Sequence, residues 1–182
     1  MAQQENLKTS AQRNLAIERM IRVNQAGEFG AKRIYAGQLA VMGDRTPAAR
    51  SIAHMAEQEE RHLSAFDKMM AERGVRPTAL HPIWSAAGFA LGAVSAAVSP
   101  EAAMACTVAV ETEIDRHYSE QLAEIGDSDP ELSAMIADFQ ADEQEHKATA
   151  LAEGAERAPA YPLMSALVRM GCRTAIAVSK HI

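Results

Sequence analysis

Apolar residues recur every three or four positions along most of the chain, the spacing that places them on one face of a helix. The stripe is clearest over residues 47–73, where Ile52, Met55, Phe66 and Met69 fall in line. No stretch alternates apolar and polar residues for long enough to indicate a strand. We therefore predict an all-α protein, with helices at about 12–42, 47–73, 83–98, 100–125, 130–153 and 161–180.

Helix start signals stand before three of these segments. Thr46, Ser99 and Asp129 each precede a proline, which matches an N-cap followed by Pro at the first helical position. A glycine stands near the end of each of the same segments, as expected for a helix stop. With 182 residues, of which 48% are hydrophobic, the chain can bury one sizeable core, and we expect a single domain over residues 1–182.

Charged residues interrupt the apolar stripe at equivalent positions of two predicted helices. Glu59 and His62 stand in the stripe of the second helix, and Glu143 and His146 in that of the fifth. Each pair reads Glu-x-x-His, so both side chains project from the same helix face. A single Glu-x-x-His is more often a solvated ion pair. Two copies, both at positions where an apolar residue is expected, favour a binding site.

The other two long helices each place one glutamate in their stripe, Glu28 in the first and Glu111 in the fourth. These two glutamates are 83 residues apart, and the two Glu-x-x-His motifs are 84 residues apart. A constant offset of this kind indicates a duplicated helix pair. We therefore predict a ferritin-like four-helix bundle, with 83–98 and 161–180 as additional helices.

Four carboxylates in a bundle core require a compensating cation, because each would cost several kcal/mol to bury alone. No Lys or Arg lies on those faces, so bound metal is the economical solution. Four Glu and two His give three ligands per half, which suits two metal ions roughly 3.5 to 4 Å apart. Ferritin-like di-iron and di-manganese bundles use this ligand set, and the lack of thiolates favours iron or manganese over structural zinc. The predicted ligands are Glu28, Glu59, His62, Glu111, Glu143 and His146.

The remaining acids and histidines receive different interpretations. Asp142 either accepts a hydrogen bond from the free ring nitrogen of a ligand histidine or is an ordinary surface aspartate. Glutamates that fall off the stripe are expected to be solvated: Glu57, Glu60, Glu113 and Glu145. Histidines that lack a carboxylate at matching spacing are expected to be ordinary surface or partly buried residues: His54, His81 and His181.

Charge and cysteine content exclude several classes of function. The net charge is −6 with a pI near 5.5, and no cluster of Lys and Arg offers a footprint for nucleic acid. The two cysteines lack C-x-x-C spacing, which suits a reducing compartment and excludes a rubredoxin-type iron site. The polar amino terminus resembles neither a signal peptide nor a transit peptide. We expect a bacterial cytoplasmic location.

The longest uncharged run covers residues 83–100 and contains two glycines. Its length is at the lower limit for a spanning helix, so we expect it to lie against a membrane surface or to pack within the protein. The last predicted helix has Arg169, Arg173 and Lys180, which suits anionic lipid headgroups. The alternative is that both additional helices pack on the bundle or on a partner protein.

Four stretches resemble the demethoxyubiquinone hydroxylase family: RVNQAGEFGAKRIYAGQ, EQEERHLSAF, CTVAVETEIDRHY and DEQEHKATA. The resemblance covers about residues 13–180. It departs from the family at Gln25, where many members have His. It implies a di-iron monooxygenase, with two Fe ions per subunit, that hydroxylates the ring of a polyprenyl quinol with O2. Peripheral attachment to the inner face of the cell membrane then follows from the lipid substrate.

The same resemblance implies roles for individual residues. By the usual pattern of this architecture, Glu59 and Glu143 bridge the two ions, whereas Glu28 and Glu111 are terminal ligands. NADH is a candidate reductant, although the chain has no G-x-G-x-x-G fingerprint for a dinucleotide. Other proteins of ubiquinone biosynthesis are candidate partners.

His117 and Tyr118 match a His-Tyr pair that the family places near the quinone, where they would assist proton or electron transfer. Tyr118 also lies on the apolar stripe and is open to interpretation as a packing aromatic. Three alternatives to the hydroxylase use similar ligands: a ferritin-like iron-handling protein, a peroxide-reducing di-metal protein and a structural metal bundle. A co-purified quinone favours the hydroxylase, whereas a soluble shell that loads many irons favours storage.

Overall fold

The computed structural model describes residues 2–44 and 46–180, with side chains from residue 10 onward. This part of the chain is helical throughout its regular structure, as predicted. Its elements are α1 (Ala2–Met42), α2 (Pro47–Arg73), α3 (His81–Val98), α4 (Pro100–Ile125), η1 (Gly126–Ser128), α5 (Pro130–Ala152), η2 (Ala155–Arg157) and α6 (Tyr161–Ser179). The predicted bounds are close to those observed except at the start of α1.

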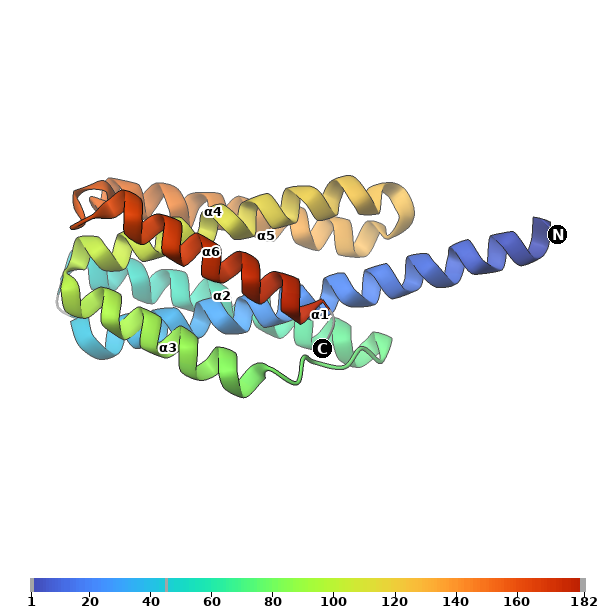
Figure 1. The fold of residues 1–182 in the computed structure, drawn as a ribbon, viewed down its shortest axis with the longest axis horizontal. Helices are drawn as coiled ribbons and strands as arrows, with labels where there is room; N and C mark the ends of the chain where they lie inside the picture. Colours follow the sequence, from blue (N-terminus) through green and yellow to red (C-terminus); the bar gives the residue numbers. More distant parts are fainter. Residues whose placement is uncertain (1, 45, 181–182) are drawn as a thin grey trace.

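The first helix begins at Ala2, whereas the apolar pattern placed its start near residue 12. The additional segment is polar, so it has no apolar stripe to detect, but it is rich in Gln, Glu, Lys and Ala and has no Gly or Pro to stop a helix. Figure 1 shows this end of α1 extending away from the other helices. The prediction failed here because a polar helical segment shows no hydrophobic periodicity.

The predicted N-caps are confirmed at three helix starts. Side-chain oxygens of Thr46, Ser99 and Asp129 each accept a hydrogen bond from the backbone N–H three residues further on, at 3.1 Å. Proline follows each cap as the first helical residue. These local signals fix where α2, α4 and α5 begin, and hence the height of their side chains along the bundle.

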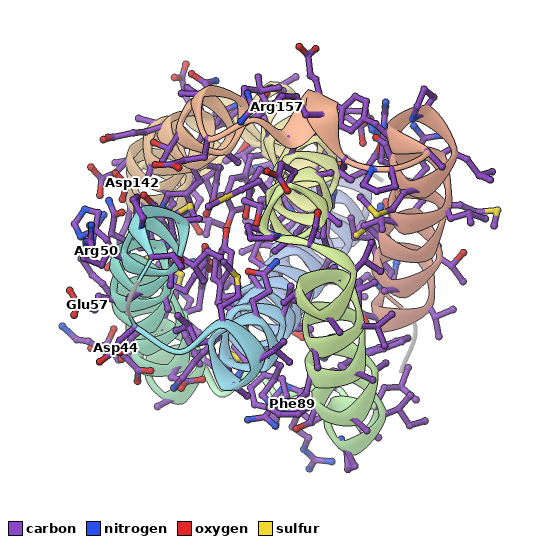
Figure 2. The ribbon with its side chains drawn as sticks, turned by 90° about the vertical axis from the view of Figure 1, so that its left-hand side faces the viewer. Asp44, Arg50, Glu57, Phe89, Asp142 and Arg157 are labelled. Carbon is purple, nitrogen blue, oxygen red and sulfur yellow. The ribbon has the colours of Figure 1, made fainter. Side chains whose placement is uncertain are left out.

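Two antiparallel helix pairs, α1 with α2 and α4 with α5, form the four-helix bundle of a ferritin-like fold. The additional helices lie on its outside, α3 packed on α1 and α6 packed on α4 (Figures 1 and 2). Each half of the chain therefore contributes three helices in the same order, and the third packs on the first. The duplication extends beyond the helix pair that the sequence indicated.

Glycines bring α3 into close contact with α1. A Cβ added at Gly92 would lie 1.9 Å from the backbone oxygen of Ile34, and one added at Gly37 would lie 2.1 Å from the backbone oxygen of Phe89. No larger residue fits at either position without moving a helix. The α3 helix thus packs on the bundle through its small residues, while Val94 and Val98 on its other face are 64% and 57% exposed.

Candidate metal centre

The six predicted ligand residues come together in the middle of the bundle. Their side chains are at most 1% exposed. They form two groups of four, and in each group one donor atom per residue lies within 4.8 Å of the others. The groups are Glu28, Glu59, His62 and Glu143, and Glu59, Glu111, Glu143 and His146. Both groups share the two glutamates that were predicted to bridge.

The donor atoms of this cluster fit a di-metal site. Five of its carboxylate oxygens are buried without a hydrogen-bond partner: Glu28 Oε2, Glu59 Oε1 and Oε2, Glu111 Oε2 and Glu143 Oε1. Buried polar groups normally have partners, and buried carboxylates need charge compensation. Carboxylate oxygens and imidazole nitrogens without thiolates suit iron or manganese. The assignment of the individual ligands stays a prediction.

Crowding shifts the pKa values of these groups in opposite directions. Burial, and then repulsion by Glu143, raises the pKa of Glu59 and of Glu111 well above the ordinary value. Burial acts in the same sense on Glu143, but close contacts with the rings of His146 and His62 outweigh it and lower its pKa to about 2. The metal-free cluster therefore retains protons that bound cations would displace.

Both histidines turn the same ring nitrogen toward the centre of the cluster. His62 Nδ1 lies 3.4 Å from Glu28 Oε2 and 3.2 Å from Glu143 Oε1. His146 Nδ1 lies 3.1 Å from Glu143 Oε2 and 3.4 Å from Glu59 Oε1. In the metal-free chain the carboxylates hold His62 as a cation: burial lowers its pKa, but contacts with Glu143 and Glu28 raise it to about 10.

The outer nitrogen of each ring contacts a residue of the facing helix. His62 Nε2 donates to Asp142 Oδ2 at 2.9 Å, and His146 Nε2 donates to Gln58 Oε1 at 3.1 Å. Figure 2 shows Asp142 on α5 at its boundary with α2. These contacts hold the Nε2 proton outside the cluster. They leave Nδ1, which points into the cluster, as the nitrogen that would bind a metal. Asp142 thus contacts a predicted ligand, but on α2 rather than on its own helix.

Two tyrosines hold the predicted terminal glutamates. The Tyr35 hydroxyl donates to Glu111 Oε1 at 2.5 Å, and the Tyr118 hydroxyl donates to Glu28 Oε1. Both tyrosines are 1% exposed. Burial, followed by the charge of the bonded glutamate, raises both tyrosine pKa values well above 10. Each hydroxyl therefore stays protonated and donates to a glutamate from the other half of the chain.

His117 lies next to Tyr118 in sequence but faces away from the cluster. Its Nε2 accepts a hydrogen bond from Gln121 Nε2 at 2.9 Å, and the Gln121 amide is fixed by two 2.8 Å hydrogen bonds with Asn24. Burial, with the charges of Lys180 and Arg116, lowers the His117 pKa to about 4. Its ring lines a separate cavity of about 210 Å³. The predicted His-Tyr pair is thus divided between two environments.

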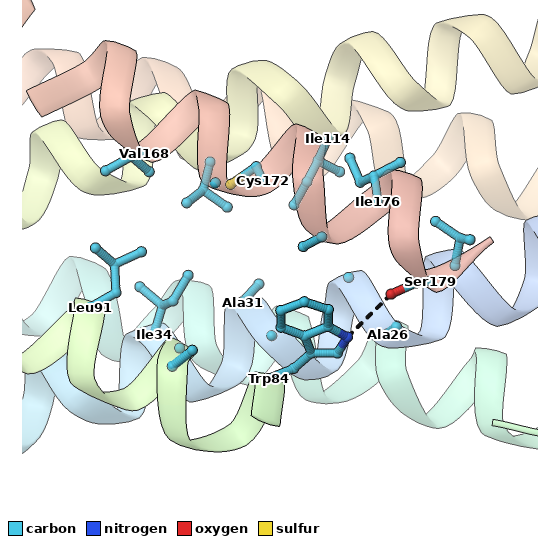
Figure 3. A pocket seen from close by; sticks show the side chains of 18 of the residues that line it. Ala26, Ala31, Ile34, Trp84, Leu91, Ile114, Val168, Cys172, Ile176 and Ser179 are labelled. Atoms are coloured by element: carbon cyan, nitrogen blue, oxygen red, sulfur yellow. Dashed lines mark hydrogen bonds between the residues drawn. The ribbon is translucent and has the colours of Figure 1, made fainter. Parts of the chain in front are cut away.

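An apolar cavity of about 440 Å³ lies between α1, α3, α4 and α6 (Figure 3). Its walls include Ala31 of α1, Leu91 of α3, Ile114 of α4 and Cys172 of α6. At one side, Trp84 Nε1 donates to Ser179 Oγ at 3.2 Å and joins α3 to α6. The two additional helices, α3 and α6, thus complete the walls of this cavity.

Comparison with known proteins identifies the family. The family described as ubiquinone biosynthesis protein COQ7 matches residues 15–179. This chain belongs to the COQ7 family. The 3-demethoxyubiquinol 3-hydroxylase of Rhodospirillum rubrum is 49% identical over 91% of this chain and 78% of its own length. The mitochondrial NADPH-dependent 3-demethoxyubiquinone 3-hydroxylase of Homo sapiens is 46% identical over 92% of this chain and 78% of its own length. The predicted resemblance and enzyme class are confirmed.

One prediction about the surface side chains of this COQ7-family chain is wrong. Glu113 was expected to be solvated, but it is fully buried, because α6 covers that face of α4. Its carboxylate accepts hydrogen bonds from Arg169 at 2.6 Å, from Arg173 at 2.8 and 2.9 Å and from Arg116 at 3.0 Å. Burial alone would raise the Glu113 pKa, but Arg173, Arg169 and Arg116 lower it to about 2. Arg169 and Arg173, expected to face headgroups, bind this carboxylate.

The other surface predictions hold, with His181 outside the described residues. The side chains found exposed as predicted are Glu57, Glu60, Glu145 and His54. His81 is partly buried, stacks on Phe29 at 4.5 Å between ring centroids, and places Nε2 2.8 Å from Gln25 Oε1. Gln25 also donates to Asp67 at 2.8 Å. The His81 imidazole of α3 thus contacts Gln25, the position at which the resemblance leads one to expect His.

Sequence reasoning missed two of the residues that surround the ligands, Tyr35 and Gln58, although the repeat offset would have found them. Glu28 and Glu111 are each followed seven residues later by Tyr and ten residues later by Gln. Gln58 and Asp142 likewise precede their Glu-x-x-His motifs at the same offset as the motifs themselves. Applied to all polar stripe positions, the offset identifies Tyr35 and Gln58 as site residues of this COQ7-family chain.

Proposed function

We propose that this chain is a di-iron monooxygenase that hydroxylates the ring of a polyprenylated demethoxyubiquinol in ubiquinone biosynthesis. One atom of O2 forms the new ring hydroxyl, and the other leaves as water after two electrons and two protons are supplied. The family and the names of the relatives support this class of reaction. Glu28, Glu59, His62, Glu111, Glu143 and His146 are the proposed iron ligands.

The observation that carries the proposal is the position of the apolar cavity beside the Glu/His cluster. Gly27 and Ala31 line the cavity and flank Glu28 in α1, while Val110 and Ile114 do the same for Glu111 in α4. A polar, metal-binding interior and an apolar chamber thus share the same two helices. An isoprenoid tail fits an apolar chamber, whereas iron storage and peroxide reduction have no use for one. This favours the hydroxylase.

The chain's own residues would position and protect the chemistry. Two irons held by these six residues would supply the binding and reduction of O2. Glu59 and Glu143 belong to both donor groups. Tyr35 and Tyr118 fix the two predicted terminal glutamates by hydrogen bonds. The full burial of the cluster excludes bulk water, which strengthens its electrostatic interactions and limits side reactions.

Access to a lipid substrate supports a membrane-surface location. By length and composition alone, the described helix α3 could cross a bilayer, and 17% of it is buried. Its packing on α1 favours an interfacial position instead. Large apolar side chains on α3 and α6, the two additional helices that line the cavity, are exposed: Ile83, Val94, Val98, Leu163, Leu167 and Met170. We propose that this face lies on the inner leaflet of a bacterial cell membrane, where other ubiquinone-biosynthesis proteins would also be reached.

The decisive experiment is a turnover assay with ¹⁸O2. Protein loaded with Fe²⁺ is mixed with demethoxyubiquinol, and the product is examined by mass spectrometry for one ¹⁸O in a new ring hydroxyl. NADH and NADPH are compared as donors with the oxidised quinone, because the reductant is part of the proposal and several relatives are named NADPH-dependent. Iron-dependent O2 uptake without a hydroxylated ring would reject the proposed substrate.

A matched pair of variants tests the cavity. Cys172→Phe fills the chamber, whereas Cys172→Ser keeps its volume. We expect Cys172→Phe to lower turnover of a long-tailed quinol at least tenfold more than turnover of a short-tailed analogue, with iron content unchanged. Equal loss on both substrates would show that the tail does not occupy this space.

A second pair tests the membrane face. Val94→Asp with Leu167→Asp places charges on the proposed interface, while Leu151→Asp places one on an exposed apolar residue of α5. Binding to vesicles of anionic phospholipid should weaken only in the first variant, because charge is costly in the apolar boundary. Loss of binding in the α5 variant as well would argue against a defined face.

A further inference from the structure

The two halves of the Glu/His cluster share their geometry but differ in charge among the residues around the outer histidine nitrogens. Asp142 and Gln58 occupy equivalent places 84 residues apart, and each accepts from the outer nitrogen of the histidine on the facing helix. One acceptor is a carboxylate and the other is a neutral amide.

Further contacts strengthen the difference. Arg61 and His62 hold the Asp142 carboxylate from two sides. Arg61 also binds Asp138 at 2.9 Å and has a guanidinium nitrogen 3.4 Å from His62 Nε2. The His62 ring stacks on Phe139 with 4.0 Å between centroids. At the positions equivalent to Arg61 and Phe139, the other half has the exposed Glu145 and the flexible Met55. The His62 ring is thus held by a charged acceptor and a stacking partner, and the His146 ring has neither at those positions.

A charged acceptor changes the ligand as well as its orientation. A histidine that donates its outer N–H to a carboxylate becomes a stronger electron donor to a metal on its other nitrogen. A neutral amide fixes the same tautomer with a weaker, uncharged hydrogen bond. Because Glu59 and Glu143 belong to both donor groups and Glu28 and Glu111 are equivalent, the outer contacts are where the two positions differ most.

We propose that the two metal positions are inequivalent: the position of His62 and Glu28 binds a divalent ion first and more tightly, and Asp142 and Gln58 set this order as positioning residues. The inference rests on the proposed function, because it assumes that the six residues are metal ligands. It assigns the early, tightly held ion to one side of the bundle and the late, more weakly held ion to the other.

The test is an anaerobic titration of the metal-free protein with Co²⁺, followed by visible absorption and calorimetry. Two binding steps are expected. Proton NMR of the histidine rings at one equivalent should show large paramagnetic shifts for His62 before His146. Asp142→Asn should weaken the first step roughly 10- to 100-fold, the usual effect of removing such a partner. The isosteric Gln58→Glu should strengthen the second step.

Three further variants separate the inference from trivial causes. Asp138→Asn removes the same charge beside Arg61 without touching His62, so it should leave both binding steps unchanged. The double variant Asp142→Asn with Gln58→Glu exchanges the two acceptors and should reverse the order, with His146 shifted first. His62→Ala should leave one weak ion. This reversal does not depend on activity, and a merely structural role for Asp142 would not produce it.

The outcomes are distinct. Two equal binding steps in the unmodified protein, or an order unchanged in the double variant, would overturn the inference while leaving a two-ion site intact. Absence of Co²⁺ binding in a folded protein would overturn the ligand assignment and the proposed function together.

Discussion

The two halves of the chain repeat each other closely around the metal cluster and diverge outside it. In both halves a tyrosine holds the glutamate of the other half, and a histidine is held from the facing helix. The additional helices do not follow the same rule. The α3 helix is held on α1 by glycine contacts, whereas α6 is held on α4 by arginines around one buried glutamate. The contacts around the metal cluster are thus duplicated, whereas the two helices that complete the cavity wall are attached by different contacts.

Breaking the shared part of the site should have the largest effect. Glu143 belongs to both donor groups, whereas Glu111 belongs to one. We expect Glu143→Ala to abolish hydroxylation and both bound irons, and Glu111→Ala to abolish hydroxylation but to retain up to one iron per chain. Iron analysis beside a turnover assay distinguishes them. Equal iron loss in both variants would show that Glu143 does not bridge.

The next prediction concerns the glycine-held helix. Gly92→Ala should destabilise the protein by about 1–3 kcal/mol, because the new Cβ meets the Ile34 backbone oxygen and one helix must move. In contrast, the Cβ of Gly171→Ala on α6 meets nothing within 4 Å, so this variant should stabilise by up to about 1 kcal/mol through helix propensity. Thermal unfolding measures both. Destabilisation by Gly171→Ala would contradict the open space found around Gly171.

The attachment of α3 and α6 illustrates which features of the molecule the sequence predicts and which it does not. The helices, the apolar stripe and the six clustered residues follow from periodicity and repeat spacing, which can be read from the sequence without tertiary information. The burial of Glu113 does not, because it depends on where α6 lies on α4. The same holds for the contact of Asp142 with His62, which joins residues on different helices, and for the cavity, which exists only once α3 and α6 are in place.

Weakening the arginine-held helix should have a local effect. Glu113→Gln removes the charge that Arg169 and Arg173 share, with a cost of about 1–3 kcal/mol for hydrogen bonds to a charged group. Hydrogen exchange should increase in α6 more than in α3. Added salt should have the same bias in the unmodified protein, because it screens partly exposed ion pairs more than glycine contacts. Uniform exchange throughout the bundle would show that α6 is not held separately.

The smallest effect expected is a pH dependence that belongs to one half only. Gln121 has a counterpart at Gln38, but His117 has none, since Ile34 stands at its equivalent position. The His117 pKa is lowered to about 4, below the ordinary histidine value of 6.5, so on acidification the unfolded chain binds this proton first. Its contribution to the free energy of unfolding is therefore complete above about pH 6.5 and is lost progressively as pH falls toward 4. The slope is at most about 1.4 kcal/mol per pH unit for one proton.

Unfolding of the metal-free protein in denaturant at pH 7 and pH 5.5 should show about 1 kcal/mol less acid sensitivity in His117→Gln than in the unmodified chain, because other titrating groups are common to both. Equal acid sensitivity would mean that burial and the charges of Lys180 and Arg116 do not hold His117 in its neutral form.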